Sequence, residues 1–309
     1  MKKTFLLFFS IVLALSFSCK KIGKEVVLKN NQIPHYEEIP TVVIENYVTR
    51  IYIDLLGRDP LNDELNTHVA ALIAVDLDTS YRAVIVDSLH NDLAPRPDEI
   101  SYKHQYYQRL YDLMKGRFLE GASEGEIQKE IALLQGGLRA DSITGDSVEY
   151  QIKKQALQLF YNVVGSKINL QEERISYNEM CKYMMNNGLY DLINMNTSNF
   201  INASFNDLYF RFPTDFEYDG AFEAIEKNNS ALLFGQAVSN KYDYLELVTN
   251  HLNFYEGMVG WMYQTLFARN PRTDELYNWT HFLAEGGSLQ KFQKELLISD
   301  EYAFFVRNN

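Results

Sequence analysis

Apolar residues recur along most of the chain at spacings of three and four residues, which is the period of an amphipathic helix. From Ile44 to Leu55 apolar residues recur at positions 44, 47, 48, 51, 52 and 55, and Gly57 and Pro60 then predict the end of the helix. Alternating runs of β-branched residues, the pattern of half-buried strands, are nearly absent. The pattern therefore predicts an all-α fold.

Local signals indicate where several of these helices begin and end. Ser123 followed by Glu126 has the pattern of a capping box at a helix start, and Gly136-Gly137 is expected to stop that helix. A further apolar stripe, from Val148 to Val163, is expected to end at Gly165. We expect the helices to form two lobes, residues 42–165 and 166–309, both built from helix-corner-helix units.

One sequence pattern occurs three times, which indicates a reused supersecondary unit. It reads YIDLLGRDPLNDEL at 52–65, FNDLYFRFPTDFEY at 205–218 and YQTLFARNPRTDEL at 263–276. The copies share, in one register, an arginine, a proline and a glutamate: Arg58, Pro60 and Glu64; Arg211, Pro213 and Glu217; Arg269, Pro271 and Glu275.

The repeated pattern predicts a helix, a tight corner and a second helix. The arginine falls in the last turn of the first helix, where a cation meets the negative end of the helix dipole. Asp59 or Asn270 is expected to cap the second helix, with the proline at its first position and the glutamate in its first turn. An arginine–glutamate pair can then bridge the corner. Two interpretations stay open: the pairs hold the corners together, or all three line a ligand groove.

The first residues have the organisation of an export signal. Lys2 and Lys3 precede an apolar run that is shorter than the roughly 20 residues needed to span a bilayer, so residues 1–18 are predicted to be a signal peptide. Ser16-Phe17-Ser18-Cys19 resembles the end of a bacterial lipoprotein signal, in which the cleaved cysteine carries the lipid. Lipidated Cys19 would then anchor the chain through a tether, residues 19–41. The alternatives are ordinary secretion with a free Cys19 and an uncleaved anchor. Lys20-Lys21 resembles outer-membrane sorting.

Composition excludes several classes of function. The 29 basic and 41 acidic residues give a formal net charge of -12, which argues against a nucleic-acid partner. The chain has two cysteines, so once Cys19 carries lipid, Cys181 has no partner for an internal disulfide. No histidine lies near Cys181 in the sequence, which favours a buried thiol over a nucleophile.

Signals of catalysis are absent from the sequence. The histidines include no pair at i and i+4 and no His-Glu-x-x-His, so neither a metal nor a cofactor is expected. Nucleophile-elbow, P-loop and dinucleotide-binding patterns are also missing. Carboxylate pairs that could serve a glycosidase are too common in so acidic a chain to be informative. We therefore expect no enzyme, with a cell-wall or polysaccharide hydrolase as the weakest alternative.

An asparagine-rich stretch is the remaining candidate for a ligand site. Its asparagines are Asn186, Asn187, Asn194, Asn196 and Asn199. Asparagine favours caps and left-handed turns, which predicts a junction between helices. The alternative is a polar loop that binds sugar or peptide, since aromatic residues stand nearby. These are Tyr183, Tyr190, Phe200, Phe205, Tyr209, Phe210 and Phe212.

Two segments resemble known helical domains. Met262 to Phe304 is similar to a domain of unknown function of secreted and surface bacterial proteins, itself similar to the phycobilisome linker domain. The residues that carry the resemblance are Tyr263, Leu266, Arg269, Pro271, Leu276, Trp279, Leu283, Gly287, Leu297, Ser299 and Tyr302. Arg50 to Asp92 resembles a helical domain that accompanies cytochrome-type modules in some bacterial lipoproteins, although the chain has no Cys-x-x-Cys-His of its own.

Because phycobilisome linkers are scaffold proteins, the resemblance implies protein interaction rather than catalysis. The leading hypothesis is a lipid-anchored, non-enzymatic scaffold or accessory subunit of an outer-membrane assembly, which is held to the membrane by the lipid on Cys19 and binds a protein partner there. The alternative is a lipoprotein that binds glycan or peptide through residues 186–199.

Overall fold

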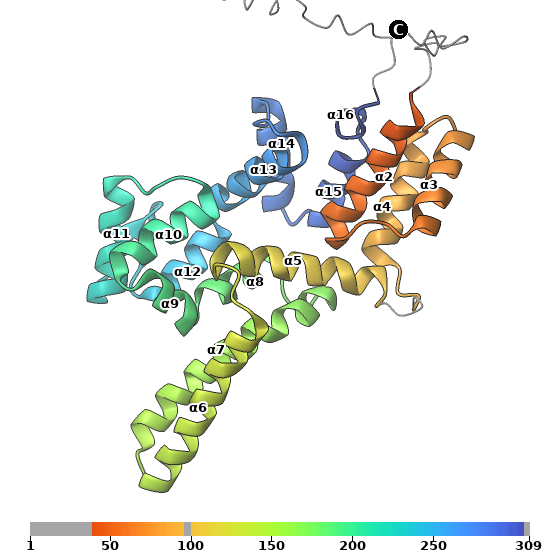
Figure 1. Cartoon of the computed structure of the whole chain (residues 1–309). Coiled ribbons are helices and arrows are strands. Elements are labelled where there is room, and N and C mark those ends of the chain that lie inside the picture. Colours follow the sequence, from red (N-terminus) through yellow and green to blue (C-terminus); the bar gives the residue numbers. More distant parts are fainter. Residues whose placement is uncertain (1–38, 96–99, 306–309) are drawn as a thin grey trace, which may run out of the picture. The chain divides into compact units, whose positions relative to one another are not determined.

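The computed structural model describes residues 39–95 and 100–305, and these residues confirm the all-α prediction. They form fifteen helices and a single two-stranded hairpin (Figure 1). The predicted signal peptide, Cys19 and most of the predicted tether lie outside the described residues. In the part of the chain described, no helix is both long and apolar enough to cross a membrane.

The elements follow one another in this order: α2 (Thr41–Leu56), α3 (Asn62–Ala74), α4 (Thr79–Asn91), α5 (Tyr102–Phe118), α6 (Glu124–Thr144), α7 (Ser147–Gln171), α8 (Tyr177–Met185), α9 (Gly188–Asn194), α10 (Thr197–Tyr209), α11 (Asp215–Lys227), β1 (Ala231–Leu233), β2 (Gln236–Val238), α12 (Lys241–Asn250), α13 (Leu252–Phe267), α14 (Thr273–Ala284), α15 (Leu289–Leu297) and α16 (Asp300–Ala303). The strands pair antiparallel, with Leu232 opposite Ala237.

Two of the boundaries predicted from the sequence are confirmed. Helix α2 ends at Leu56, and Gly57 follows in the left-handed conformation with φ of 74°, which glycine adopts without steric cost. Helix α6 begins with the expected capping box: the Ser123 hydroxyl accepts the backbone N–H of Glu126, whose carboxylate accepts the N–H of Ser123.

The two glycine stops predicted for α6 and α7 are wrong. Helix α6 continues through Gly137 because α7 packs beside it there; a Cβ on Gly137 would lie 2.9 Å from Cδ of Lys153, so the glycine makes room for the lysine stem. Helix α7 continues past Gly165 because its buried face also continues, from Phe160 and Val163 to Ser166. Tertiary packing overrides the helix-breaking tendency of glycine at both positions. The expected division at 165/166 therefore lies inside one helix.

The helices that follow the third copy of the repeated unit pack against α2 and α4. Helix α16 contacts α2, and α15 contacts α4. The Arg50 guanidinium donates to the main-chain carbonyls of Leu266, at 2.9 Å, and Tyr302, at 2.7 Å. Arg82, which is buried, forms a 2.7 Å ion pair with Asp300. The last helices of the described chain thus complete the packing around the first.

Candidate functional site

Each of the three corners contains a bidentate arginine–glutamate ion pair. The N···O distances are 2.8 and 3.0 Å for Arg58 and Glu64, 2.8 and 2.7 Å for Arg211 and Glu217, and 2.8 and 3.0 Å for Arg269 and Glu275. Each glutamate also accepts a 2.7 Å hydrogen bond from a backbone N–H, that of Leu61, Thr214 or Arg272. The arginine–glutamate pairing predicted from the repeat is therefore formed in all three copies.

The prolines do not take the first helical position, so this part of the prediction is wrong. Helices α3, α11 and α14 begin two residues after Pro60, Pro213 and Pro271, and the residue in between is the N-cap. Neither Asp59 nor Asn270 is a cap. The glutamate sets this register, because a capping box joins the third helical residue to the N-cap, and a cap at residue 59 would have placed Glu64 too far into the helix.

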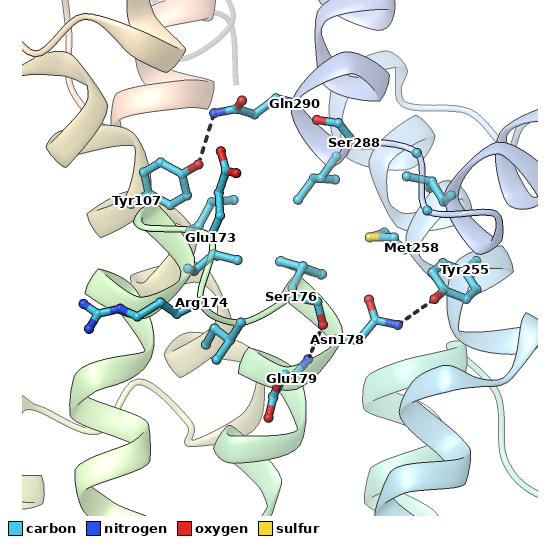
Figure 2. A pocket seen from close by; sticks show the side chains of 18 of the residues that line it. Tyr107, Glu173, Arg174, Ser176, Asn178, Glu179, Tyr255, Met258, Ser288 and Gln290 are labelled. Atoms are coloured by element: carbon cyan, nitrogen blue, oxygen red, sulfur yellow. Dashed lines mark hydrogen bonds between the residues drawn. The ribbon is translucent and has the colours of Figure 1, made fainter.

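The corner glutamates are held in the charged form. Burial alone would raise the pKa of Glu64, but hydrogen bonds from Arg58, Tyr102 and the N–H of Leu61 outweigh it and lower the pKa to about 2. The pKa of Glu217 is lowered against the effect of burial in the same way, and Arg269 lowers that of Glu275. Each glutamate thus has an opposite charge within its own corner, as the interpretation that the pairs hold the corners together expects. None of the three pairs lines the cavity of about 720 Å³ that is described below (Figure 2).

The second corner differs from the other two in the residues that it exposes. It carries three phenylalanines, Phe210, Phe212 and Phe216, with exposed fractions of 40%, 70% and 68%. The equivalent residues are Gly57, Asp59 and Asp63 in the first copy and Ala268, Asn270 and Asp274 in the third. Phe210 has a φ of 57°, which is unfavourable for so large a side chain, and the Arg117 guanidinium lies 3.9 Å from its ring centroid. We call these three phenylalanines the aromatic corner.

The asparagine-rich stretch lies at the junctions of α8, α9 and α10. Asn187 and Asn196 are the N-caps of α9 and α10, and their side chains accept backbone N–H groups of those helices. Asn194 is buried and donates to the carbonyl of residue 190. Asn186 is the C-cap of α8, and Asn199 supplies the N–H that Asn196 accepts. Asn196 also lines a cavity of about 240 Å³.

The aromatic residues around this stretch fall into two groups. Tyr190, Phe200, Phe205 and Tyr209 are buried in the core. Phe210 and Phe212 are exposed at the aromatic corner, and Tyr183 is half-buried. Helical spacing alone does not separate the groups, but alignment of the three repeat copies does, because Phe212 replaces a polar residue of both other copies.

Cys181 is buried and faces Met114, with an Sγ–Sδ distance of 3.6 Å. Burial strongly raises the pKa of the thiol, so the reactive thiolate is scarce at neutral pH. In a Cys19→Ser variant, where Cys181 is the only thiol, we expect Ellman's reagent at pH 8 to react very slowly with the folded protein. One equivalent should react at once in denaturant. Fast reaction in the folded state would contradict the buried thiol.

A cavity of about 720 Å³, within the usual range for small-molecule sites, opens between α5, the α7–α8 connection, the start of α13 and the α14–α15 connection (Figure 2). Its walls mix leucine, methionine and tyrosine side chains with amide, hydroxyl and carboxylate groups, among them Tyr107, Glu173, Asn178, Tyr255 and Gln290. We call it the polar pocket. No sequence pattern indicates this pocket, because its walls come from four separate segments.

No group of three or more histidine, cysteine or acidic residues in residues 39–95 and 100–305 is arranged to hold a metal ion. Comparisons with protein-family models, with curated proteins and with solved structures give no match for this chain. The resemblance to the linker-like helical domain therefore remains a prediction from its residues.

Proposed function

We propose that this protein is a lipid-anchored, non-enzymatic scaffold of the outer membrane, which docks a protein partner through its aromatic corner. The observation that carries the proposal is the exposure of Phe212 and Phe216 at positions that are polar in both other copies. Aromatic side chains are enriched at the centres of protein interfaces, where burying one ring contributes much of the binding energy.

The surroundings of the aromatic corner define the kind of partner that would fit. Asp215 and Asp219 are exposed on α11, one and three residues from Phe216 in the sequence, and Glu217 is already neutralised by Arg211. The complementary surface would offer apolar recesses for the rings with basic side chains around them. The first and third corners lack such rings, so docking would be confined to the second.

The test is affinity purification of the tagged, full-length lipoprotein from gently solubilised native membranes, with Cys19→Ser as the unanchored control. We expect a stoichiometric membrane protein to accompany the wild type and to be lost from the Phe212→Asp/Phe216→Asp variant. These changes install the residues of the first copy, Asp59 and Asp63, so thermal stability should stay the same.

A matched control exists on α7. Val148 has an exposed fraction of 68%, equal to that of Phe216, and both are the second residue of their helix. Val148→Asp should retain the partner. Recovery of the protein alone from intact membranes, or equal retention by the double phenylalanine variant, would refute the proposal.

A further inference from the structure

The side chain of Asn178 in the polar pocket is fixed in orientation, and its Oδ1 is available to accept a hydrogen bond. Asn178 is only 9% exposed, and its Nδ2 donates to the carbonyl of Thr249 at 2.8 Å and to the Tyr255 hydroxyl at 2.9 Å. Because a carbonyl can only accept, these bonds determine which end of the amide is nitrogen. Figure 2 shows Oδ1 directed into the pocket, where no described group donates to it.

The Tyr255 hydroxyl beside it completes a pair of complementary groups. It accepts from Asn178, so its own proton is available, and no described group accepts that proton. A ligand hydroxyl seated between the two could donate to Asn178 Oδ1 and accept from Tyr255 at the same time. Such paired donation and acceptance is what a hydroxyl group needs when it leaves water.

A carboxylate stands at the mouth of the pocket. Glu173 adopts a left-handed backbone conformation, with φ of 57°, at the α7–α8 connection. Its side chain lies beside Tyr107 and Gln290, which are joined by a 3.3 Å hydrogen bond (Figure 2). The other charged groups point away: Arg174 pairs with Glu172, and Glu179 accepts from the Tyr183 hydroxyl.

The polarity and charge of the side chains that line the pocket favour an uncharged ligand. The buried part of the pocket carries neutral polar groups and apolar side chains, including Met258 and Leu283, so a charged ligand group would be buried there without an opposite charge. The single carboxylate at the mouth disfavours anions. A neutral molecule with several hydroxyls and an apolar face fits both kinds of wall.

We propose that the polar pocket binds a neutral oligosaccharide, whose hydroxyls bond to Asn178, Tyr255 and Glu173 and whose apolar ring faces pack against Tyr107 and Met258. The site is distinct from the aromatic corner and does not depend on the scaffold proposal. It also differs from the asparagine-rich stretch, whose side chains cap helices.

The test screens the full mature chain on an array of neutral and charged glycans, followed by calorimetric titration with cellohexaose, maltohexaose, xylohexaose and mannohexaose. We expect at least one neutral hexasaccharide to bind. Glu173→Gln should weaken that binding by about tenfold, since a neutral amide oxygen accepts a hydrogen bond less strongly than a carboxylate does. Gln290→Trp, which fills the mouth, should abolish it.

The matched control is Glu172→Gln, one residue away, because Glu172 does not line the pocket and its partner Arg174 directs its guanidinium away from the pocket (Figure 2). It should bind as the wild type does, and all three variants should keep the wild-type melting temperature. The proposal is overturned if no neutral glycan binds, if only charged glycans bind, or if binding survives both Glu173→Gln and Gln290→Trp. Glu173→Gln lies at an exposed position, so it tests the pocket even if the tryptophan variant fails to fold.

Discussion

Replacing Gly257 by alanine should destabilise the protein by about 3 kcal/mol or prevent its folding, because α13 lies directly against the end of α10 at this residue. A Cβ at Gly257 would lie 2.2 Å from the carbonyl oxygen of Leu208 and 3.1 Å from Cα of Tyr209. Both obstacles are backbone atoms, so no side chain can turn aside, and the two helices would have to separate.

Gly260 offers the matched control, because it lies in the same helix and a Cβ there would meet nothing within 4 Å. Gly260→Ala should raise the free energy of unfolding by about 0.5–1 kcal/mol through the helix propensity of alanine. Urea denaturation followed by circular dichroism measures both effects. Similar stabilities for the two variants would show that α10 and α13 are not in backbone contact.

The second large effect is expected from Glu64→Gln, which should lower the free energy of unfolding by about 2 kcal/mol. The amide cannot replace the charge-assisted bonds from Arg58 and Tyr102. Glu275→Gln is the matched control. Its two bonds from Arg269 match those that Glu64 accepts from Arg58, but no tyrosine of the described residues donates to Glu275, so the loss should be smaller.

The Glu64 pair should also make stability depend on pH. The folded-state pKa of about 2 lies below the ordinary value of 4.5, so the stabilisation is fully present above about pH 4.5 and is lost as the pH falls towards 2. Wild-type protein should therefore lose more stability than Glu64→Gln between pH 5 and 2, in denaturation series at constant ionic strength. Parallel losses in both proteins would contradict the lowered pKa.

The predictions that succeeded rest on neighbours in sequence. The end of α2 at Gly57, the Ser123–Glu126 capping box and the Arg58–Glu64 pair each involve residues at most six apart. The predictions that failed depend on distant residues: Gly137 stays helical because of Lys153, and Gly165 because the buried face of α7 continues. Local propensity cannot show these effects.

The two proposed sites also differ in whether their residues are close together in the sequence. The aromatic corner is visible in the sequence once the three copies are aligned, because Phe212 and Phe216 stand where the other copies have aspartate or asparagine. The polar pocket is not, because Tyr107, Asn178, Tyr255 and Gln290 come from four segments that only the folded chain brings together (Figure 2).

The contact between the first and last described helices also constrains the order in which the chain can fold. Arg50 binds the carbonyl of Tyr302 across 252 positions, and the rings of Tyr47 and Phe305 pack with their centroids 5.2 Å apart. During synthesis, α2 emerges long before residues 302–305. Until these residues follow, the part of its apolar face that they cover stays exposed to solvent. Such long-range closure is slow because a large loop must be ordered before the contact forms. A nascent chain would leave this contact open until residues 302–305 have been released, and removal of these residues should expose α2 to proteases.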